Sequence, residues 1–240
     1  KDKNILILCG GWSDEREISL TSGKGVYDAL LDDGYAVSYM DLQSNDKIKL
    51  TDYIKSKQID LVFNLIHGLG GEDGLIQSYL DDCDAKYVGS NAVSSNLSFN
   101  KIATKDRWMN LNLPTPSYSN LLGMNQEYLR EIQNSDKIVV KPKSSGSSVG
   151  IKLIKKDTDI NIFLKNQYLD HLMEEYIPGS DFTVGLMNGK VIGMLEIITE
   201  KEIYDYEFKY NSSSTKYVIP TNLEADVKKE ICSYSEKSFK

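Results

Sequence analysis

The hydrophobic pattern at the start of the chain predicts strands and helices in alternation. Residues 5–9 form a continuous apolar run that ends at Gly10 and Gly11, as in a buried strand that leads into a ligand-facing loop. A helix should follow, with Ser13 or Asp14 as its N-cap and Gly34 at its end. Its apolar face should carry Val26, Ala29 and Leu30.

The same alternation continues to about residue 93. We expect strands at residues 36–40, 60–66 and 87–88 and helices at 50–57 and 75–82, with a glycine-rich loop at 68–74. Alternating strands and helices imply a parallel sheet. Residues 1–93 are therefore predicted to form a Rossmann-like, parallel α/β domain.

After residue 93 the pattern changes. A helix is expected at 94–111, with Leu97, Ile102 and Met109 among its apolar positions. Strands at 138–142 and 150–154 are joined by a Gly/Ser loop with no intervening helix, which predicts an antiparallel hairpin with a long tip. A helix at 159–167 and a strand at 172–176 should follow.

The last part of the chain predicts a second hairpin and a final helix. Strands at 182–187 and 191–198 are joined by Asn188-Gly189, a strong signal for a type I′ turn. The segment 224–240 is amphipathic, with Val227, Ile231 and Tyr234 on one side. We expect an α/β domain followed by an α+β domain. The α+β domain should consist of two subdomains, residues 94–178 and residues 179–240. The final helix has no C-cap glycine, so we expect that second domain to be incomplete.

Composition and charge narrow the class of protein. The chain is 40% hydrophobic and 26% charged, as is usual for a folded globular protein. Its net charge of −7 argues against a nucleic-acid partner but leaves a phosphate-bearing small ligand open. The cysteines at 9, 83 and 232 have no metal-site spacing. The first apolar run is too short for a signal peptide or a membrane span, so we expect a cytoplasmic protein with no membrane partner.

The loop at 143–149 is a candidate phosphate grip. It is rich in Ser and Gly, so backbone N–H groups and hydroxyls such as that of Ser148 could surround phosphates, while Lys141 adds charge from the preceding strand. The order of a Walker A loop is absent. The alternative is a solvated hairpin tip.

The strand end at 173–181 is a candidate nucleoside site. Glu174 could hold a purine amine, Tyr176 and Ile177 could lie against the ring, and Asp181 could hold ribose hydroxyls. The alternative interpretation is a solvated acidic edge.

One carboxylate, Glu15, and one imidazole, His67, each follow a predicted strand of the first domain. They should lie at the edge of the sheet where α/β folds bind ligands. Glu15 could hold an ammonium group, or it could only stabilise the helix dipole. His67 could orient a carboxylate or phosphoryl oxygen, or it could be an ordinary loop histidine. There is no GxGxxG motif, so a dinucleotide is not expected.

The segment 204–210 is crowded with tyrosines and charges. We interpret it as an ordered lid with Lys209 and Tyr210 turned toward a site. A surface strand with stacked tyrosines is the alternative.

Taken together and in this order, these motifs resemble those of the D-alanine–D-alanine ligase family of the ATP-grasp superfamily. The resemblance covers nearly the whole chain. It rests on Gly-Gly-x-Ser-x-Glu-Arg-Glu at 10–17, His-Gly-x-Gly-Gly-Glu-Asp-Gly at 67–74, Gly-Ser-Ser-Val-Gly at 146–150 and Tyr-Asp-Tyr-Glu-x-Lys-Tyr at 204–210.

The resemblance implies a pre-ATP-grasp domain followed by an ATP-grasp domain, with ATP between two α+β subdomains. The residues implied to bind ATP are Lys101, Lys141 and Lys209 at the phosphates, Glu174 and Ile177 at adenine, and Asp181 at ribose. It also implies that Glu15 binds the ammonium of the first D-alanine, that Ser147 and Tyr210 link to Glu15, and that His67 lies near the carboxylate being activated.

The implied reaction makes a D-alanyl phosphate from ATP and then D-alanyl-D-alanine, for peptidoglycan synthesis. Two Mg²⁺ ions are expected, for which Mn²⁺ could substitute, with ligands after residue 240 and none in this chain. The resemblance also implies a homodimer. Tyr210 favours D-alanine as the second substrate. The alternatives are a D-Ala–D-Ser or D-Ala–D-lactate ligase and a catalytically dead nucleotide-binding module.

Overall fold

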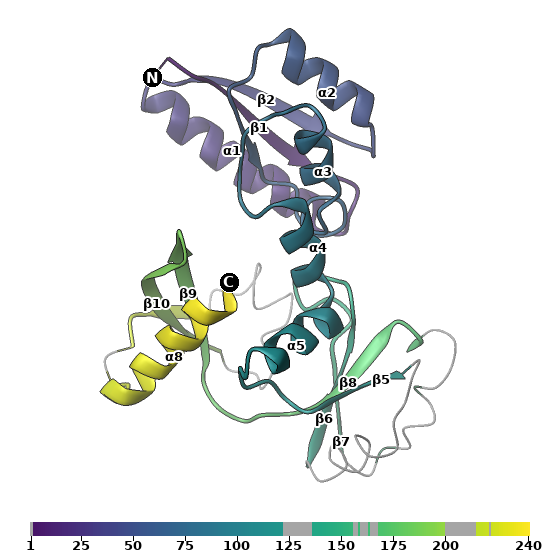
Figure 1. Cartoon of the computed structure of the whole chain (residues 1–240), viewed down its shortest axis with the longest axis vertical. Coiled ribbons are helices and arrows are strands. Elements are labelled where there is room, and N and C mark those ends of the chain that lie inside the picture. The colour runs from purple at the N-terminus through teal and green to yellow at the C-terminus, as the bar shows by residue number, and fades with distance from the viewer. Residues whose placement is uncertain are drawn as a thin grey trace. The chain divides into compact units, whose positions relative to one another are not determined.

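The computed structural model of the chain describes residues 2–121, 136–155, 158, 163, 168–199, 215–220 and 222–240. These residues form two compact units (Figure 1). The first comprises residues 1–101 and 144–146, and the second comprises residues 102–143 and 147–240.

The first unit is built on a four-stranded parallel sheet with the order β2-β1-β3-β4. Its strands are β1 (Asn4–Gly10), β2 (Ala36–Leu42), β3 (Leu61–Asn64) and β4 (Tyr87–Val88). The helices that connect them are α1 (Arg16–Asp32), α2 (Lys47–Ser56) and α3 (Leu75–Asp81). The predicted parallel α/β arrangement is confirmed.

Side-chain alternation along β1 places helices on both faces of this sheet. Leu6 and Leu8 belong to a buried cluster with Leu50 and Ile54 of α2 and with residues of α3. Cys9 points to the other face, where α1 packs. Because both faces are covered, β1 is apolar throughout, and this explains why its sequence shows no alternation.

The packing of α1 differs from the prediction. Its buried residues are Ser19 and Gly23, whereas Ala29 is exposed and Val26 is only half-buried. A Cβ atom on Gly23 would lie 2.8 Å from Cys9 Cβ, so the helix backbone approaches the strand closely. The residue before the helix, its N-cap, is Glu15 and not Ser13 or Asp14.

The helix predicted at 94–111 is two helices, α4 (Ala92–Phe99) and α5 (Lys101–Asn110). The break is at Asn100, whose φ of −90° and ψ of 103° are extended, so a helix cannot continue through it. Met109 is 42% exposed, whereas Lys105 on the same helix is only 5% exposed. This inversion of the expected pattern brings a cation into the interior of the second unit.

The second unit contains two antiparallel sheets. One has the order β5-β8-β6-β7, and its strands are β5 (Tyr118–Asn120), β6 (Lys137–Pro142), β7 (Lys152–Lys155) and β8 (His171–Glu175). The predicted hairpin of β6 and β7 is confirmed. Its apolar core contains Leu121, Ile138, Val140, Phe163 and Met173. The helix predicted at 159–167 falls mainly on residues outside the described part of the chain.

The other sheet has the order β11-β10-β9 and is accompanied by one helix. These elements are β9 (Asp181–Met187), β10 (Lys190–Ile198), β11 (Lys216–Val218) and α8 (Ala225–Ser238). Asn188 and Gly189 have φ angles of 50° and 75°, so the hairpin has the positive φ angles predicted for a type I′ turn.

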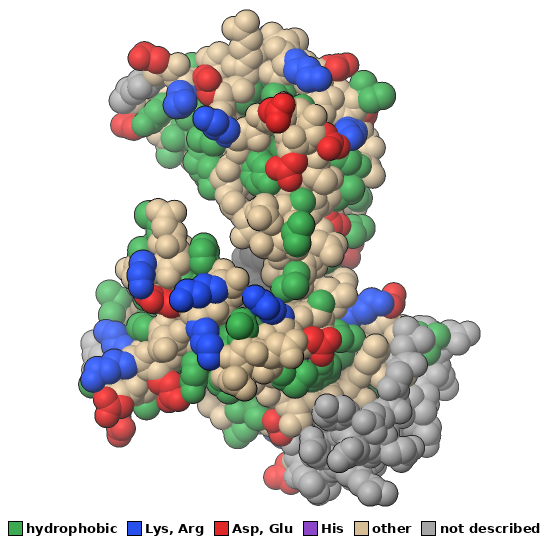
Figure 2. Space-filling model, in the orientation of Figure 1, with side chains coloured by type: hydrophobic (Ala, Val, Ile, Leu, Met, Phe, Trp, Pro, Cys, Tyr) green, Lys and Arg blue, Asp and Glu red, His purple; other side chains and the backbone are tan. Residues whose placement is uncertain are grey.

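Charged contacts attach α8 to β10. Lys190 Nζ lies 2.9 Å from Glu236 Oε2, and the backbone N–H of Val191 donates to Glu236 Oε1 at 3.4 Å. Figure 2 shows Lys and Arg side chains gathered over the part of this unit that holds α8. Within the described residues, no helix combines the length and the apolar character needed to cross a membrane.

The close contact of α1 with β1 can be tested with two glycines of one helix. Gly23→Ala places a methyl group against Cys9, whereas a Cβ on Gly25 has no atom within 4 Å. We expect Gly23→Ala to lower the free energy of unfolding by about 1–3 kcal/mol relative to Gly25→Ala. Gly25→Ala should leave it unchanged or raise it by up to about 1 kcal/mol. Urea unfolding followed by circular dichroism measures both, and equal midpoints would contradict the close contact.

Candidate active site

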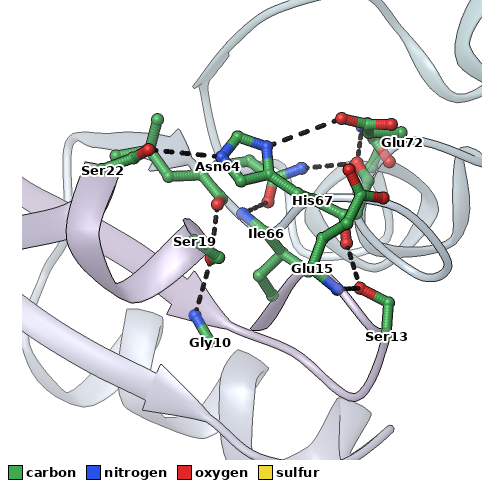
Figure 3. A network of polar contacts seen from close by, with 12 residues as sticks. Gly10, Ser13, Glu15, Ser19, Ser22, Asn64, Ile66, His67 and Glu72 are labelled. Atoms are coloured by element: carbon green, nitrogen blue, oxygen red, sulfur yellow. Dashed lines mark hydrogen bonds and ion pairs between the residues drawn. The ribbon is translucent and has the colours of Figure 1, made fainter. Parts of the chain in front are cut away.

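In the first unit, the carboxyl ends of β1 and β3 are joined by a buried serine. Ser19 Oγ accepts a hydrogen bond from Gly10 N at 2.8 Å and donates to the carbonyl of Leu65 at 2.6 Å (Figure 3). Parallel sheets bind ligands at this edge. Ser19 therefore fixes the two loops that carry Glu15 and His67.

Glu15 lies at this edge with only 6% of its surface exposed. Its backbone N–H donates to Ser13 Oγ at 3.2 Å, and the same hydroxyl donates to the carbonyl of His67 at 2.7 Å. Ser13 thus links the loop between β1 and α1 to the loop after β3. A carboxylate held out of water in this way favours a cationic ligand.

Glycines give the Glu15 carboxylate its space. Gly68 has a φ of +66°, and a Cβ there would lie 2.4 Å from Glu15 Oε2. A Cβ on Gly146, which also belongs to the first unit, would lie 2.7 Å from the same oxygen. No other residue would fit at either position without moving Glu15.

His67 lies between a hydroxyl and a carboxylate. Its Nε2 is 3.4 Å from Ser22 Oγ, and its Nδ1 is 3.6 Å from Glu72 Oε1 (Figure 3). The carboxylate favours a proton on Nδ1, which leaves Nε2 to accept from the Ser22 hydroxyl. His67 lies in the loop after β3, as predicted from its place beyond a strand end. Its role near a substrate carboxylate stays a prediction.

An ion pair holds the turn after β1. Arg16 Nη1 and Nη2 donate to the two carboxylate oxygens of Asp41 at 2.7 and 2.6 Å, and Nη1 also donates to the carbonyl of Gly11 at 3.1 Å. The guanidinium lowers the pKa of Asp41 through these hydrogen bonds. Arg16 therefore fixes the backbone immediately before Glu15.

The second unit has a buried cluster of two lysines and a glutamate. Glu174 of β8 is 6% exposed. Its Oε1 contacts Lys141 Nζ of β6, and its Oε2 lies 2.8 Å from Lys105 Nζ of α5. Antiparallel pairing of β6 with β8 and the burial of α5 against this face bring the three residues together.

Lys105 was not among the predicted site residues. Burial lowers its pKa, and the charge of Glu174 partly opposes that effect. The only feature of the sequence that could have indicated a role for Lys105 is its position four residues after Lys101. This spacing puts both lysines on one side of α5. A lysine on a helix is normally solvated, so this signal is weak.

The predicted nucleoside residues lie where β8 ends. Tyr176 is half-buried, with Lys137 Nζ 5.6 Å from its ring centroid, whereas Ile177 and Asp181 are exposed. Tyr176 and Ile177 directly follow β8, which carries Glu174, whereas Asp181 is the first residue of β9 in the other sheet. Whether they bind adenine and ribose remains a prediction.

The predicted phosphate loop has strained backbone. Ser147 and Ser148 both have left-handed φ angles, 48° and 60°. Such strain in residues other than glycine is concentrated at functional sites. In the first unit, Lys101 Nζ donates to the carbonyl of Ser145 in this loop at 2.7 Å. The predicted lid residues Lys209 and Tyr210 lie outside the described residues.

A metal ligand set was not predicted in this chain. Among the described residues, no group of three or more His, Cys, Asp or Glu side chains could hold a metal ion.

The fold and these two clusters define a class of protein. A parallel α/β unit followed by antiparallel sheets with a Ser/Gly hairpin loop is the architecture of the ATP-grasp ligases. In agreement, the crystal structure of a D-alanine–D-alanine ligase from Bacillus anthracis superimposes with a TM-score of 0.80 at 28% identity, covering 99% of this chain and 78% of that one.

The sequence comparisons identify the family within that class. Residues 108–240 match the model of the D-Ala–D-Ala ligase C-terminus. D-alanine–D-alanine ligases from Geotalea uraniireducens and Rickettsia typhi are 32% and 34% identical to the chain. They align with 100% and 99% of it, and with 77% and 73% of their own lengths. The chain belongs to the D-alanine–D-alanine ligase family.

The Arg16–Asp41 pair predicts a pH-dependent stability. Because the pKa of Asp41 is lowered in the folded state, the pair's contribution is fully present above the ordinary value of 3.8 and is lost as the pH falls through the folded-state pKa. Arg16→Met should therefore lower the free energy of unfolding at neutral pH, and the difference from the unsubstituted protein should narrow below pH 3.8.

Urea unfolding over this pH range is the measurement. Lys24→Met removes a cation from an exposed position of the same helix and is the matched control. A deficit for Arg16→Met that is independent of pH would show that the lost contact with Asp41 is not its cause.

Proposed function

We propose that this protein is an ATP-dependent ligase that joins two D-alanine molecules for peptidoglycan synthesis. Membership in the family supports the reaction class. The single observation that supports the amino-acid site is the buried carboxylate of Glu15, enclosed by Gly68 and Gly146 at the edge of the parallel sheet.

Glu15 is proposed to bind the ammonium group of the first D-alanine. A carboxylate that is 6% exposed is stabilised by a cation that comes close to it. A side chain at Gly68 or Gly146 would meet the carboxylate, so the two glycines keep the Glu15 oxygens clear of side chains from these loops. Ser147 and Tyr210 are proposed to complete this hydrogen-bonded set, and His67 to lie near the carboxylate of the same substrate.

ATP is proposed to bind through the phosphate loop and the end of β8. Lys101, Lys141, Lys209 and Ser148 would hold the phosphates, Glu174, Tyr176 and Ile177 the adenine, and Asp181 the ribose. Support comes from the contact of Lys141 with Glu174, from the place of Tyr176 two residues after Glu174, and from the strained backbone of the loop.

The proposed reaction has two balanced steps. A carboxylate oxygen of the first D-alanine attacks the γ-phosphorus of ATP, the bond to the β–γ bridging oxygen breaks, and ADP leaves. The neutral amine of the second D-alanine then attacks the acyl carbon, loses a proton and displaces inorganic phosphate. The acyl phosphate must be shielded from water, and this is the role proposed for the loop at 143–149 and the lid.

Several further properties belong to the proposal by family resemblance. These are a requirement for Mg²⁺, which Mn²⁺ could meet, a homodimeric state and a cytoplasmic location. No residue of the described chain is assigned as a metal ligand. Sedimentation of the purified protein would test the dimer.

Phosphate release by the full-length polypeptide tests the proposed reaction directly. ATP and Mg²⁺ are supplied with D-alanine, with L-alanine or with no amino acid. We expect release only with D-alanine, accompanied by D-alanyl-D-alanine. Adding D-serine or D-lactate beside D-alanine tests the alternative ligases. Formation of D-alanyl-D-serine or D-alanyl-D-lactate would support one of them. A folded protein that shows no stimulation by D-alanine would contradict the proposal.

Glu15 and Glu17 provide a matched pair of substitutions. Glu15 is buried beside the glycines, whereas Glu17 lies exposed two residues later. Glu15→Gln removes the charge that pairs with the substrate ammonium, so the KM for D-alanine should rise roughly 100-fold. The KM for ATP should change little, and Glu17→Gln should leave both unchanged. An equal increase in both KM values for Glu15→Gln would exclude the ammonium role.

A further inference from the structure

The ammonium of Lys105 is buried in the second unit and held by several contacts. It is 5% exposed and donates hydrogen bonds to Thr115 Oγ1 at 2.8 Å and to the carbonyl of Pro116 at 2.9 Å. It also lies 5.1 Å from the ring centroid of Tyr118. These contacts fix its direction, so it is held by the protein and is not extended toward a substrate.

Its ionic partner is Glu174, a buried carboxylate of β8. Lys105 Nζ lies 2.8 Å from Glu174 Oε2, and Lys141 Nζ contacts Glu174 Oε1. The two lysines therefore hold the carboxylate from both of its oxygens. A carboxylate has about four lone-pair sites, so Glu174 can still accept a hydrogen bond from a ligand.

The two lysines reach the carboxylate of Glu174 from different elements, Lys105 from α5 and Lys141 from β6. A charged carboxylate only accepts hydrogen bonds, whereas a protonated one can also donate. If Lys105 were absent, Glu174 would be a buried charge with one cation, and its orientation would no longer be fixed from the α5 side. The two lysines thus fix the direction in which Glu174 can accept a hydrogen bond from a ligand.

We propose that Lys105 is a positioning residue for nucleotide selection, which holds Glu174 as an acceptor-only group facing the 6-amino position of the purine. This rests on the proposed function, in which Glu174 binds adenine. A 6-amino group donates to such a carboxylate, whereas the 6-oxo group of inosine or guanine nucleotides repels it. Lys105 touches no reacting atom and acts through Glu174.

The test compares binding of ATP and of ITP, which differ at position 6, to the full-length polypeptide with Mg²⁺. Isothermal titration calorimetry gives both dissociation constants without requiring turnover. Lys105→Met removes the charge and keeps much of the length. Arg107→Met removes a cation from an exposed position of the same helix and is the matched control.

We expect Lys105→Met to weaken ATP binding about tenfold and to narrow the preference for ATP over ITP by a similar factor. Arg107→Met should keep both values. In turnover, the KM for ATP should rise while the KM for D-alanine stays constant. A purely structural role would lower the melting temperature and leave the ATP-to-ITP ratio intact, and that result would overturn the proposal.

If Lys105→Met does not fold, Thr115→Val provides a second variant for the same comparison of ATP and ITP binding. It removes one acceptor of the Lys105 ammonium and preserves side-chain volume. We expect the same narrowing of the ATP preference, by a smaller factor, and an unchanged ratio would overturn the proposal. Failure of the proposed ligase reaction is a separate outcome, because it would appear as missing D-alanine-dependent phosphate release in the unsubstituted protein.

Discussion

The structure depends on a constraint that applies to any carboxylate removed from water: donors or cations must compensate for the lost solvation. Glu15 and Glu174 are each 6% exposed, and neither contributes to an apolar core. The two units compensate for the lost solvation in different ways. In the first unit, serines and glycines bring loop backbone close to Glu15, whereas in the second, two lysines converge on Glu174.

The two solutions suit different ligands. Loop backbone around a carboxylate makes a compact site that neutralises a single small cation. A carboxylate already flanked by two cations carries little net demand for a third, so it can instead discriminate hydrogen-bond donors from acceptors. Under the proposed function, the same residue type would recognise the charge of a ligand in one unit and its pattern of hydrogen-bond donors and acceptors in the other.

The sequence was most informative where one physical requirement dominated. Full burial on both faces made β1 a continuous apolar run, and the positive φ angles of a two-residue turn required Asn188-Gly189. The apolar face of α1 was predicted wrongly because close packing selected Ser19 and Gly23 in place of large side chains. A prediction based on hydrophobicity alone does not identify small residues such as Ser and Gly as buried.

The site was predictable in part for similar reasons. Glu15 and His67 follow strand ends in the sequence, so the edge of a parallel sheet had to bring them together. Lys105 was missed because its burial depends on Glu174, which is 69 residues away and reaches it only through pairing of β8 with its neighbours. The break at Asn100 was missed because an asparagine opposes a helix only weakly.

The contact between α1 and β1 has a consequence for thiol chemistry. Cys9 is fully buried beneath Gly23, and burial raises the pKa of its thiol, so little reactive thiolate forms. Cys83 and Cys232 are only partly buried. An alkylating reagent would thus modify those two first and reach Cys9 only when α1 separates from the sheet. The rate of Cys9 modification would report local opening at the base of the loop that carries Glu15.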